Sequence, residues 1–280
     1  MDYKLILVLL LIGHMGGDFY FQPPSMIERK YTETKIMIKH GLIYLAAIMP
    51  PLVIACAAPP AGWCLVLVIP LLHIVTDIAK ALWLNKKPLF KEHPLRLFAV
   101  DQTLHLAIIA VTAYVCAVHL GFTGSSMSTG LNTVYTNLAL GLPAQKLLRL
   151  ISLLLFLGKP ATVLLQKISA NFAIKKQTGA RLEQTGGWRI VTEDSYREAP
   201  PHLILNLPSS AIMGAAERYV ASILVLVGQY SALGLIFAAR TVTCWSNIRK
   251  NPATGAQYLN YALLNLLLAV GGAVLYIYIP

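Results

Sequence analysis

The sequence predicts an all-α polytopic membrane bundle of about eight transmembrane helices, from its composition, the length of its apolar stretches and the placement of its charges. Of the 280 residues, 56% are apolar and 12% are charged, and the mean hydropathy is +0.63. Soluble domains carry about 25% charged residues and disordered chains carry few apolar ones, so both classes are excluded. Only four cysteines in 280 residues exclude a disulfide scaffold.

Eight apolar stretches have about the 17–25 residues that a transmembrane helix needs. They divide the chain into a five-helix half at 1–169, a cytosolic linker at 170–208 and a three-helix half at 209–280. We expect the first stretch to be retained and not cleaved as a signal peptide, because HMGGDFYFQ ends it without an A-x-A pattern. The stretches are 3–22, 39–57, 63–83, 96–120, 145–168, 209–228, 230–248 and 254–279.

The net charge of +11 has a topological explanation. On the predicted path, 17 of the 23 Lys and Arg residues lie on one side of the membrane, and the loops on the other side hold none. The positive-inside rule then places the basic segments in the cytoplasm and both termini outside. The basicity therefore indicates orientation, and no nucleic-acid partner is expected. The basic segments are 23–39, 84–96, 159–208 and 249–250, and the alternate loops are 58–62, 121–143 and 228–229.

Three of the five aspartates fall inside predicted membrane helices, each four residues from a histidine. Residues i and i+4 share one face of a helix. Two of these helices run inward and place His before Asp, and the third runs outward and reverses the order. All three aspartates then lie about 6–10 Å from the cytoplasmic helix ends, and the histidines about 12–16 Å. We expect these six side chains to share one layer, called here the His/Asp layer: His14, Asp18, His73, Asp77, Asp101 and His105.

A carboxylate in the middle of a membrane helix costs about 2.5–3.5 kcal/mol, so these aspartates need protons, cations or a metal. Neutral imidazoles and carboxylates are suitable ligands for zinc, and also for manganese or iron. The alternative is a hydrogen-bonded network that only joins helices. Three pairs at matched depth favour a metal or catalytic site, with all six residues of the His/Asp layer as candidate ligands.

Other polar residues lie at similar depth. Glu217 and Arg240 each lie about 12 Å from the cytoplasmic ends of their helices, and an interior ion pair is their expected use. Glu217 is also a candidate general base, and Asp77 and Asp101 are the other candidate catalytic carboxylates.

Several neighbours of the layer have open roles. We expect Lys80 to extend to the membrane interface. His40 is either a ligand or an interfacial residue, and Gln22 and Gln102 flank the layer as hydrogen-bond donors. Pro70 removes a backbone hydrogen bond one turn before the layer, which suits a cavity there.

The chain contains no Walker loop, dinucleotide fingerprint, G-x-S-x-G elbow or HExxH motif. The segments HMGGDFYFQPPSMIERK, HIVTDIAK and DQTLH resemble the bacterial membrane family catalogued as domain of unknown function 3307. GAAERYVASILVLVGQYSALGLIFAAR is similar to the family's second half, although Gln257 replaces an expected acid and Arg240 an expected lysine. The resemblance implies a bacterial inner-membrane protein and supplies no activity.

Two classes of function follow from the site, with a third left open. The first is a metal-dependent intramembrane hydrolase acting on a lipid or lipid-linked substrate at the cytoplasmic side, with membrane lipids around it. The second is a proton- or cation-coupled transporter or channel. A non-catalytic membrane subunit, and assembly as a homo-oligomer, are left open.

Overall fold

The computed structural model describes residues 3–55, 61–86, 94–119, 144–169, 207–250 and 252–278. Every secondary-structure element among them is a helix, so the predicted all-α class is confirmed. Four described helical segments are long and apolar enough to cross a membrane: Tyr3–Tyr20, Pro94–Val118, Gln145–Ser169 and Tyr258–Tyr278.

The chain divides into two compact units. The first comprises Met1–Pro160 with Tyr278–Pro280, and the second comprises Ala161–Ile277. The division of the chain at 169 and 209 expected from the sequence stays a prediction. Residues 170–206 of the predicted linker lie outside the described residues.

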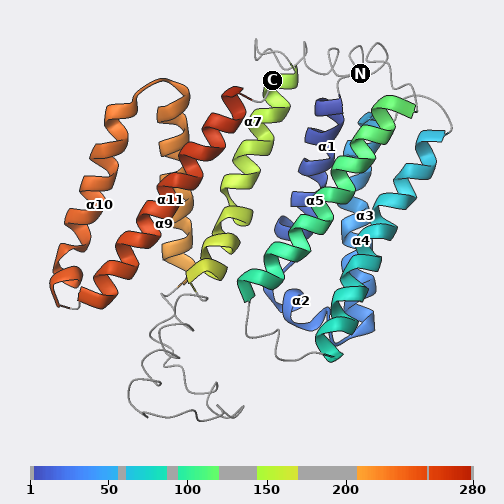
Figure 1. The fold of residues 1–280 in the computed structure, drawn as a ribbon, viewed down its shortest axis with the longest axis horizontal. Coiled ribbons are helices and arrows are strands. Elements are labelled where there is room, and N and C mark those ends of the chain that lie inside the picture. Colours follow the sequence, from blue (N-terminus) through green and yellow to red (C-terminus); the bar gives the residue numbers. More distant parts are fainter. Residues whose placement is uncertain are drawn as a thin grey trace. The chain divides into compact units, whose positions relative to one another are not determined.

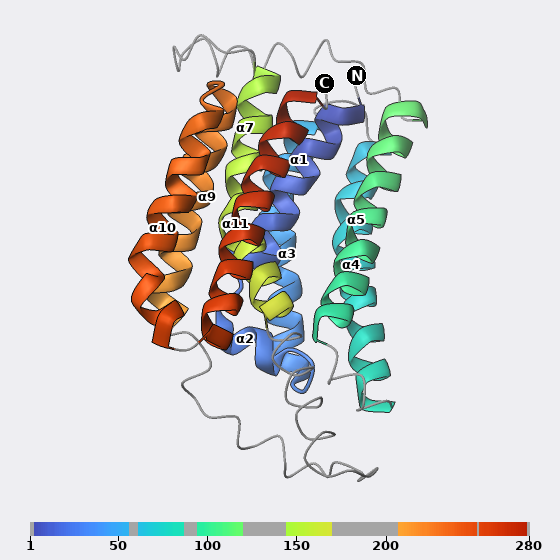
Figure 2. The same cartoon turned by 60° about the vertical axis from the view of Figure 1, so that its left-hand side comes forward.

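The first unit is built around its N-terminal helix. α1 packs against α3, α5 and α7, while α4 packs against α3 and α5, so that α1, α3, α4 and α5 enclose a common interior (Figures 1 and 2). The elements are α1 (Tyr3–Met15), the π-helix η1 (Gly16–Tyr20), α2 (Pro24–Arg29), α3 (Thr34–Ala55), α4 (Ala61–Lys86), α5 (Pro94–His119) and α7 (Ala144–Leu157).

The apolar half of this interior lies toward the N-terminal end of α1. Buried side chains from α1, α3, α4 and α5 form one cluster there, and Leu10, Ile48 and Ala113 have no exposed surface. Packing apolar residues from four helices fixes their rotation, and this places the polar residues that follow Leu10 on α1 in the same interior. The cluster comprises Ile6, Leu9, Leu10, Tyr44, Ile48, Ile69, Ile109, Ala113 and Cys116.

The π-helix η1 continues α1 and carries Asp18. Phe21 N–H donates to the carbonyl of Gly16 at 2.8 Å, the i to i+5 bond that defines this geometry. A Cβ at Gly17 would lie 2.7 Å from Tyr44 Cδ2 and 3.2 Å from Tyr44 Cα. Only glycine fits at this position, so Gly17 allows η1 to approach α3 closely.

The helix that begins at Ala144 is interrupted. α7 ends at Leu157, Gly158 forms a turn, and helix resumes over 159–169. Pro160 lacks the N–H that would continue the hydrogen-bond ladder across this point. Gln145–Ser169 nevertheless counts as one apolar segment long enough to cross a membrane, in agreement with the stretch predicted at 145–168.

The second unit contains α9 (Leu207–Leu226), α10 (Tyr230–Lys250) and α11 (Pro252–Tyr278). α9 and α10 pack together after a turn at Gly228, whose φ of 75° favours glycine. Arg218 is completely buried and donates at 2.5 Å to Asn265 Oδ1 and to Thr162 Oγ1. A polar network therefore ties α9 to α11 and to the helical residues after Pro160.

Candidate metal centre

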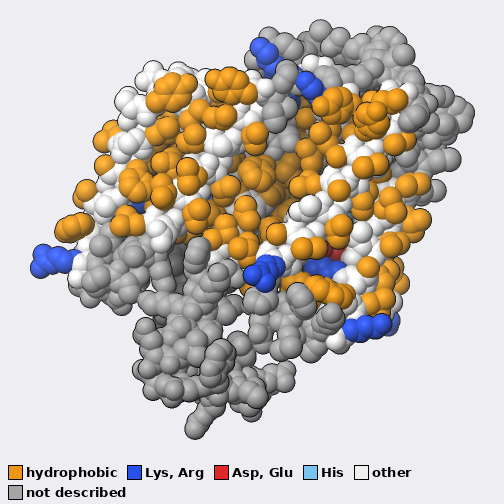
Figure 3. All heavy atoms as spheres, in the orientation of Figure 1, with side chains coloured by type: hydrophobic (Ala, Val, Ile, Leu, Met, Phe, Trp, Pro, Cys, Tyr) orange, Lys and Arg blue, Asp and Glu red, His pale blue; other side chains and the backbone are white. Residues whose placement is uncertain are grey.

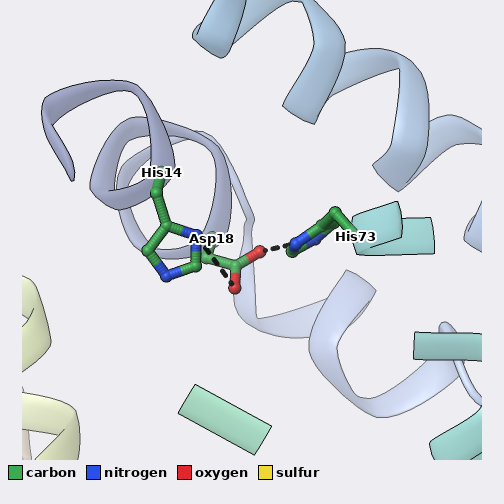
Figure 4. A group of neighbouring side chains, drawn as sticks. All are labelled: His14, Asp18 and His73. Atoms are coloured by element: carbon green, nitrogen blue, oxygen red, sulfur yellow. Dashed lines mark ion pairs between the residues drawn. The ribbon is translucent and has the colours of Figure 1, made fainter. Parts of the chain in front are cut away.

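The carboxylate of Asp18 lies at the centre of the His/Asp layer. Its Oδ1 lies 3.1 Å from His73 Nε2 and 3.4 Å from His40 Nε2, and its Oδ2 lies 3.9 Å from Nδ1 of both His14 and His105. Figure 4 shows the carboxylate between the imidazoles of His14 and His73, from α1 and α4. Four imidazoles from four helices therefore surround one buried carboxylate.

Asp18, His40 and His73 form a compact triad, called here the Asp18 triad. His40 Nε2 and His73 Nε2 are 3.2 Å apart, so the three edges measure 3.1, 3.2 and 3.4 Å. Tetrahedral zinc with bonds of about 2.0–2.1 Å requires ligand atoms about 3.3–3.4 Å apart. The edges of the Asp18 triad are therefore close to those of three ligands on one ion.

The layer also contains buried polar atoms with no hydrogen bond among the described residues. They include one carboxylate oxygen of Asp77 and the Nδ1 atoms of His40, His73 and His105. Buried polar atoms are nearly always satisfied in folded proteins. This unsatisfied capacity, concentrated where nitrogen and oxygen ligands converge, fits a group that the amino-acid chain alone does not supply.

Asp77 is paired with a lysine from outside its helix. Lys30, which follows α2, donates from Nζ to Asp77 Oδ2 at 3.0 Å, and its Nζ lies 3.4 Å from His40 Nε2. Burial lowers the pKa of Lys30, but the charges of Asp18 and Asp77 outweigh burial and raise it above its ordinary value. Lys30 is therefore a fixed positive charge at neutral pH.

Asp101 has a different cation. Lys80 Nζ lies 2.8 Å from Asp101 Oδ2 and donates to Tyr31 Oη at 2.8 Å. The Lys80 side chain thus points toward the His/Asp layer. The sequence predicts instead that it extends to the membrane interface. Burial, followed by the charges of Asp77, Asp101 and Asp18, raises the pKa of Tyr31, so the phenol stays neutral.

The orientation of the imidazoles is set by their neighbours. The ring of Tyr44 stacks on His73 at a centroid distance of 3.6 Å and an angle of 6°, and Tyr44 Oη lies 3.3 Å from His14 Nδ1. Thr76 Oγ1 lies 2.7 Å from His105 Nε2, and Gln102 Oε1 lies 3.3 Å from His14 Nε2. A hydroxyl or amide group thus contacts a ring nitrogen of His14 and of His105 and orients both rings.

The formal charges of the layer do not balance. Lys30 neutralises Asp77 and Lys80 neutralises Asp101, while the ion-pair contacts of Asp18 among the described residues are all with imidazoles. With neutral histidines the layer therefore carries one uncompensated negative charge. A buried carboxylate requires a counter-charge. A divalent cation or a proton on an imidazole would supply it.

The structure brings all six residues of the His/Asp layer together. The ligand atoms of His14, Asp18 and His73 lie within 4.8 Å of one another, as do those of Asp77, Asp101 and His105. The shortest histidine–aspartate contacts join different helices, whereas the i, i+4 pairs His14–Asp18 and His73–Asp77 measure 3.9 and 3.7 Å. Helical spacing thus predicted that each His–Asp pair shares one helix face, but not which histidine each aspartate contacts most closely.

Three central residues were not assigned to the layer from the sequence. From the sequence alone, the role of His40 is open, Lys30 is a topological charge, and Tyr44 has no assigned role. Tyr44 lies four residues after His40, so the helical spacing used for the His–Asp pairs places both on one face. The contact of Lys30 with Asp77 joins residues 47 apart, and no local pattern indicates it.

Glu217 lies in the second unit. It forms the expected ion pair with Arg240, and its Oε2 also accepts a hydrogen bond from Asn265 Nδ2 at 3.0 Å. The interior ion pair is confirmed. The role of Glu217 as a general base stays a prediction.

The fold and the layer define an all-α protein with membrane-length helices and a buried histidine–aspartate cluster. Residues 6–132 match the family described as "Protein of unknown function (DUF3307)", which confirms the family resemblance over this part of the chain. The match spans α1 to α5 and so includes the whole His/Asp layer, while the likeness expected for the second half lies outside it. No curated protein and no solved structure matches the chain.

Proposed function

We propose that this protein is an integral membrane enzyme that holds a divalent metal ion at the Asp18 triad and hydrolyses a lipid or lipid-linked substrate. The observation that carries the proposal is the triad itself. Two imidazole nitrogens and a carboxylate oxygen lie 3.1–3.4 Å apart, buried, around a charge with no lysine or arginine partner among the described residues. Three protein ligands leave a fourth position open, as in catalytic zinc sites.

The neighbouring residues suit the hydrolysis of a substrate. A zinc ion would activate a water molecule near neutral pH, and manganese or iron are the alternatives. Asp77 Oδ2 lies 3.2 Å from His40 Nε2 and is held by Lys30, while its buried Oδ1 makes no hydrogen bond with the described residues. Asp77 is therefore placed to accept the proton of the water as general base, and Lys30 holds its other oxygen.

The membrane placement is part of the proposal. Hydrophobic side chains cover most of the helix faces visible in Figure 3. Among the large hydrophobic side chains, Leu42, Leu71 and Val111 are each more than 60% exposed. Contiguous apolar surfaces of this extent are unusual for a soluble protein. Each of the eight predicted stretches also contains a described helix. We propose eight spans in a bacterial inner membrane with both termini outside.

Reporter fusions test this topology. A fusion after Pro60 precedes α4 and a fusion after Asn85 falls at its last residues, so they should report opposite sides, with the second in the cytoplasm. The same side for both would remove α4 from the membrane and overturn the arrangement.

Metal analysis tests the site. The full-length protein, purified in detergent, should retain one divalent ion per chain by elemental mass spectrometry. Asp18→Asn and His73→Gln each remove a ligand and should lose it. His105→Gln is the matched control, because His105 is equally buried but lies 3.9 Å from Asp18 and outside the triad. Metal-free wild type, or equal loss in all three variants, would overturn the triad as a metal site.

Activity is tested on the loaded protein in lipid nanodiscs. Mass spectrometry of the lipid pool should reveal a metal-dependent hydrolysis product that a chelator suppresses. Asp77→Asn should keep the ion and lose the product. Retained activity in this variant would remove Asp77 as the base.

A second candidate, proton-coupled transport, has an observation of its own. Polar contacts run from Tyr31 through Lys80, Asp101 and Gln102 to His14, at 2.8, 2.8, 3.5 and 3.3 Å. This series of polar contacts links the connection between α2 and α3 to the imidazoles of the His/Asp layer. Proton flux in metal-free proteoliposomes, lost in Asp101→Asn, would favour this candidate over the hydrolase.

A further inference from the structure

One segment of the first unit lies across the end of the bundle. Residues 22–33 connect η1 to α3 and contain the six-residue helix α2, at the end of α3 that lies away from the N-terminus (Figures 1 and 2). Gln22, Met26 and Lys30 are buried at four-residue intervals, with 4–5% of each exposed. One side of this segment, called here the α2 strap, therefore faces the interior of the bundle.

The α2 strap is attached to the His/Asp layer by polar contacts. Lys30 Nζ donates to Asp77 Oδ2 at 3.0 Å, and Tyr31 Oη accepts from Lys80 Nζ at 2.8 Å. Both ammonium groups also lie over the ring of Tyr31, at 5.1 and 4.8 Å from its centroid. Two consecutive residues of the strap thus contact two residues of α4 that are one helical turn apart.

The layer next to the strap is closed to solvent. The four histidines His14, His40, His73 and His105 are each at most 2% exposed, and Asp77 has no exposed surface. Water, an ion or a substrate can therefore reach these groups only if part of the enclosing structure moves.

Among the described elements around the layer, the α2 strap has the least apolar attachment. α1, α3, α4 and α5 share the apolar cluster, so displacing any of them breaks close packing among four helices. Of the three buried side chains of the strap, only Met26 is apolar. The strap lies between two predicted membrane stretches, so water can replace its polar contacts at a small net cost. Segments held in this way are the ones that open most readily.

We propose that the α2 strap is a lid over the His/Asp layer, latched shut by Lys30 on Asp77 and by Tyr31 on Lys80. Opening the lid exposes the imidazoles, and closing it restores both contacts and excludes water from the layer. The lid goes beyond the proposed function, because a hydrolase and a transporter need the same access.

Thiol modification tests the lid in the full-length protein in nanodiscs, without metal or turnover. His105→Cys places a thiol at a buried position of the layer, where the histidine nitrogen lies within 4.8 Å of ligand atoms of Asp77 and Asp101. The native Cys116, 2% exposed in the apolar cluster, reports unfolding of the whole unit. Iodoacetamide is the probe, because a neutral reagent is not attracted or repelled when a variant changes the charge. The other three cysteines are replaced by alanine: Cys56, Cys64 and Cys244.

Variants of the two latches should speed modification at position 105 and leave Cys116 unchanged. Lys30→Met removes a hydrogen bond between charged groups and should raise the rate at least about tenfold. Tyr31→Phe removes only a hydroxyl and should give a smaller increase in a less perturbed protein. Glu33→Gln is the matched control, because it breaks the exposed pair with Arg29 on the same strap and should leave the rate unchanged. Thermal unfolding verifies that each variant folds.

Hydrogen exchange measures the same opening independently. Lys30 N–H donates to the carbonyl of Met26 at 2.9 Å, and this bond protects the amide while the strap is docked. A helix of six residues is not stable by itself, so its amides exchange when the lid opens. Exchange over residues 22–33 should accelerate by the same factor as thiol modification in each variant.

The outcomes are distinct. Equal acceleration at position 105 and at Cys116 would show that the latches hold the whole bundle, and no acceleration in either latch variant would show that the strap is not the entrance. Rapid modification at position 105 with both latches intact would overturn the closed lid. The expected rates in a protein that binds no metal would overturn the proposed hydrolase and leave the lid standing.

Discussion

Lys30 Nζ lies 3.0 Å from Asp77 Oδ2, and the side chains are 6% and 0% exposed. Lys30 belongs to the connection between α2 and α3, whereas Asp77 lies on α4. This buried ion pair joins a segment outside the bundle to its most buried carboxylate. Breaking such a pair by removing one partner leaves a buried charge unpaired.

We therefore expect Asp77→Asn to destabilise the protein by about 3–5 kcal/mol through the stranded ammonium of Lys30. The double variant Lys30→Met/Asp77→Asn removes both charges and should recover most of that loss. The measurement is the free energy of unfolding in detergent for Asp77→Asn, Lys30→Met and the double variant. Additive losses would show that the two residues do not interact.

The stability of the first unit should fall at alkaline pH. Burial lowers the pKa of Lys30, but the charges of Asp18 and Asp77 raise it by more. Burial and the nearby carboxylates both raise the pKa of Tyr31. The folded protein then keeps protons that the unfolded chain loses above about pH 10. Stability from both groups is thus fully present below that pH and is lost as the pH rises through the folded-state pKa values.

The check is unfolding as a function of pH, with phenolate absorbance as a second signal. Tyr31→Phe should remove the tyrosine part of the alkaline loss and leave the lysine part. A loss that begins between pH 7 and 9 would contradict this assignment.

Gly17→Ala should destabilise the bundle. The added Cβ would lie 2.7 Å from Tyr44 Cδ2 and 3.2 Å from the Tyr44 backbone, so η1 and α3 would have to separate. Overpacking of this kind costs about 1–3 kcal/mol. Since Tyr44 stacks on His73, the variant should also weaken metal retention.

Gly271→Ala on α11 is the control for Gly17→Ala, because nothing lies within 4 Å of its added Cβ. It should be neutral or stabilising by up to about 1 kcal/mol, the helix preference of alanine over glycine. Equal effects at both positions would remove the steric explanation. Thermal unfolding measures both.

Glu217→Gln should destabilise the second unit by about 3 kcal/mol, at the lower end for a buried pair because 22% of the Glu217 side chain is exposed. The amide keeps the hydrogen bond from Asn265 but removes the charge facing Arg240. Glu33→Gln is the comparison, since the Arg29–Glu33 pair is exposed and screened by water, and no measurable change is expected. Metal content should stay unchanged in both variants.

Sequence patterns predicted the helices and the shared polar layer well. Apolar length and composition predicted an all-α fold, and the spacing of His14–Asp18, His73–Asp77 and Asp101–His105 placed each pair on one helix face. That is local geometry, because i and i+4 are neighbours on a helix whatever surrounds it. The turn at Gly158 has no signal in the apolar composition, which continues across it.

The identity of each partner was decided by the tertiary structure. The sequence predicts Lys30 as a loop charge, whereas in the structure it donates to Asp77. It predicts Lys80 as an interfacial residue, whereas in the structure Lys80 contacts Asp101 and Tyr31. His40 joins Asp18 and His73 because Gly17 lets η1 approach α3. The sequence by itself determined which charged residues need a partner inside the apolar bundle, since burying an unpaired charge is costly. Only the packing of four helices determined which counter-charge each one meets, because those contacts join residues distant in the chain.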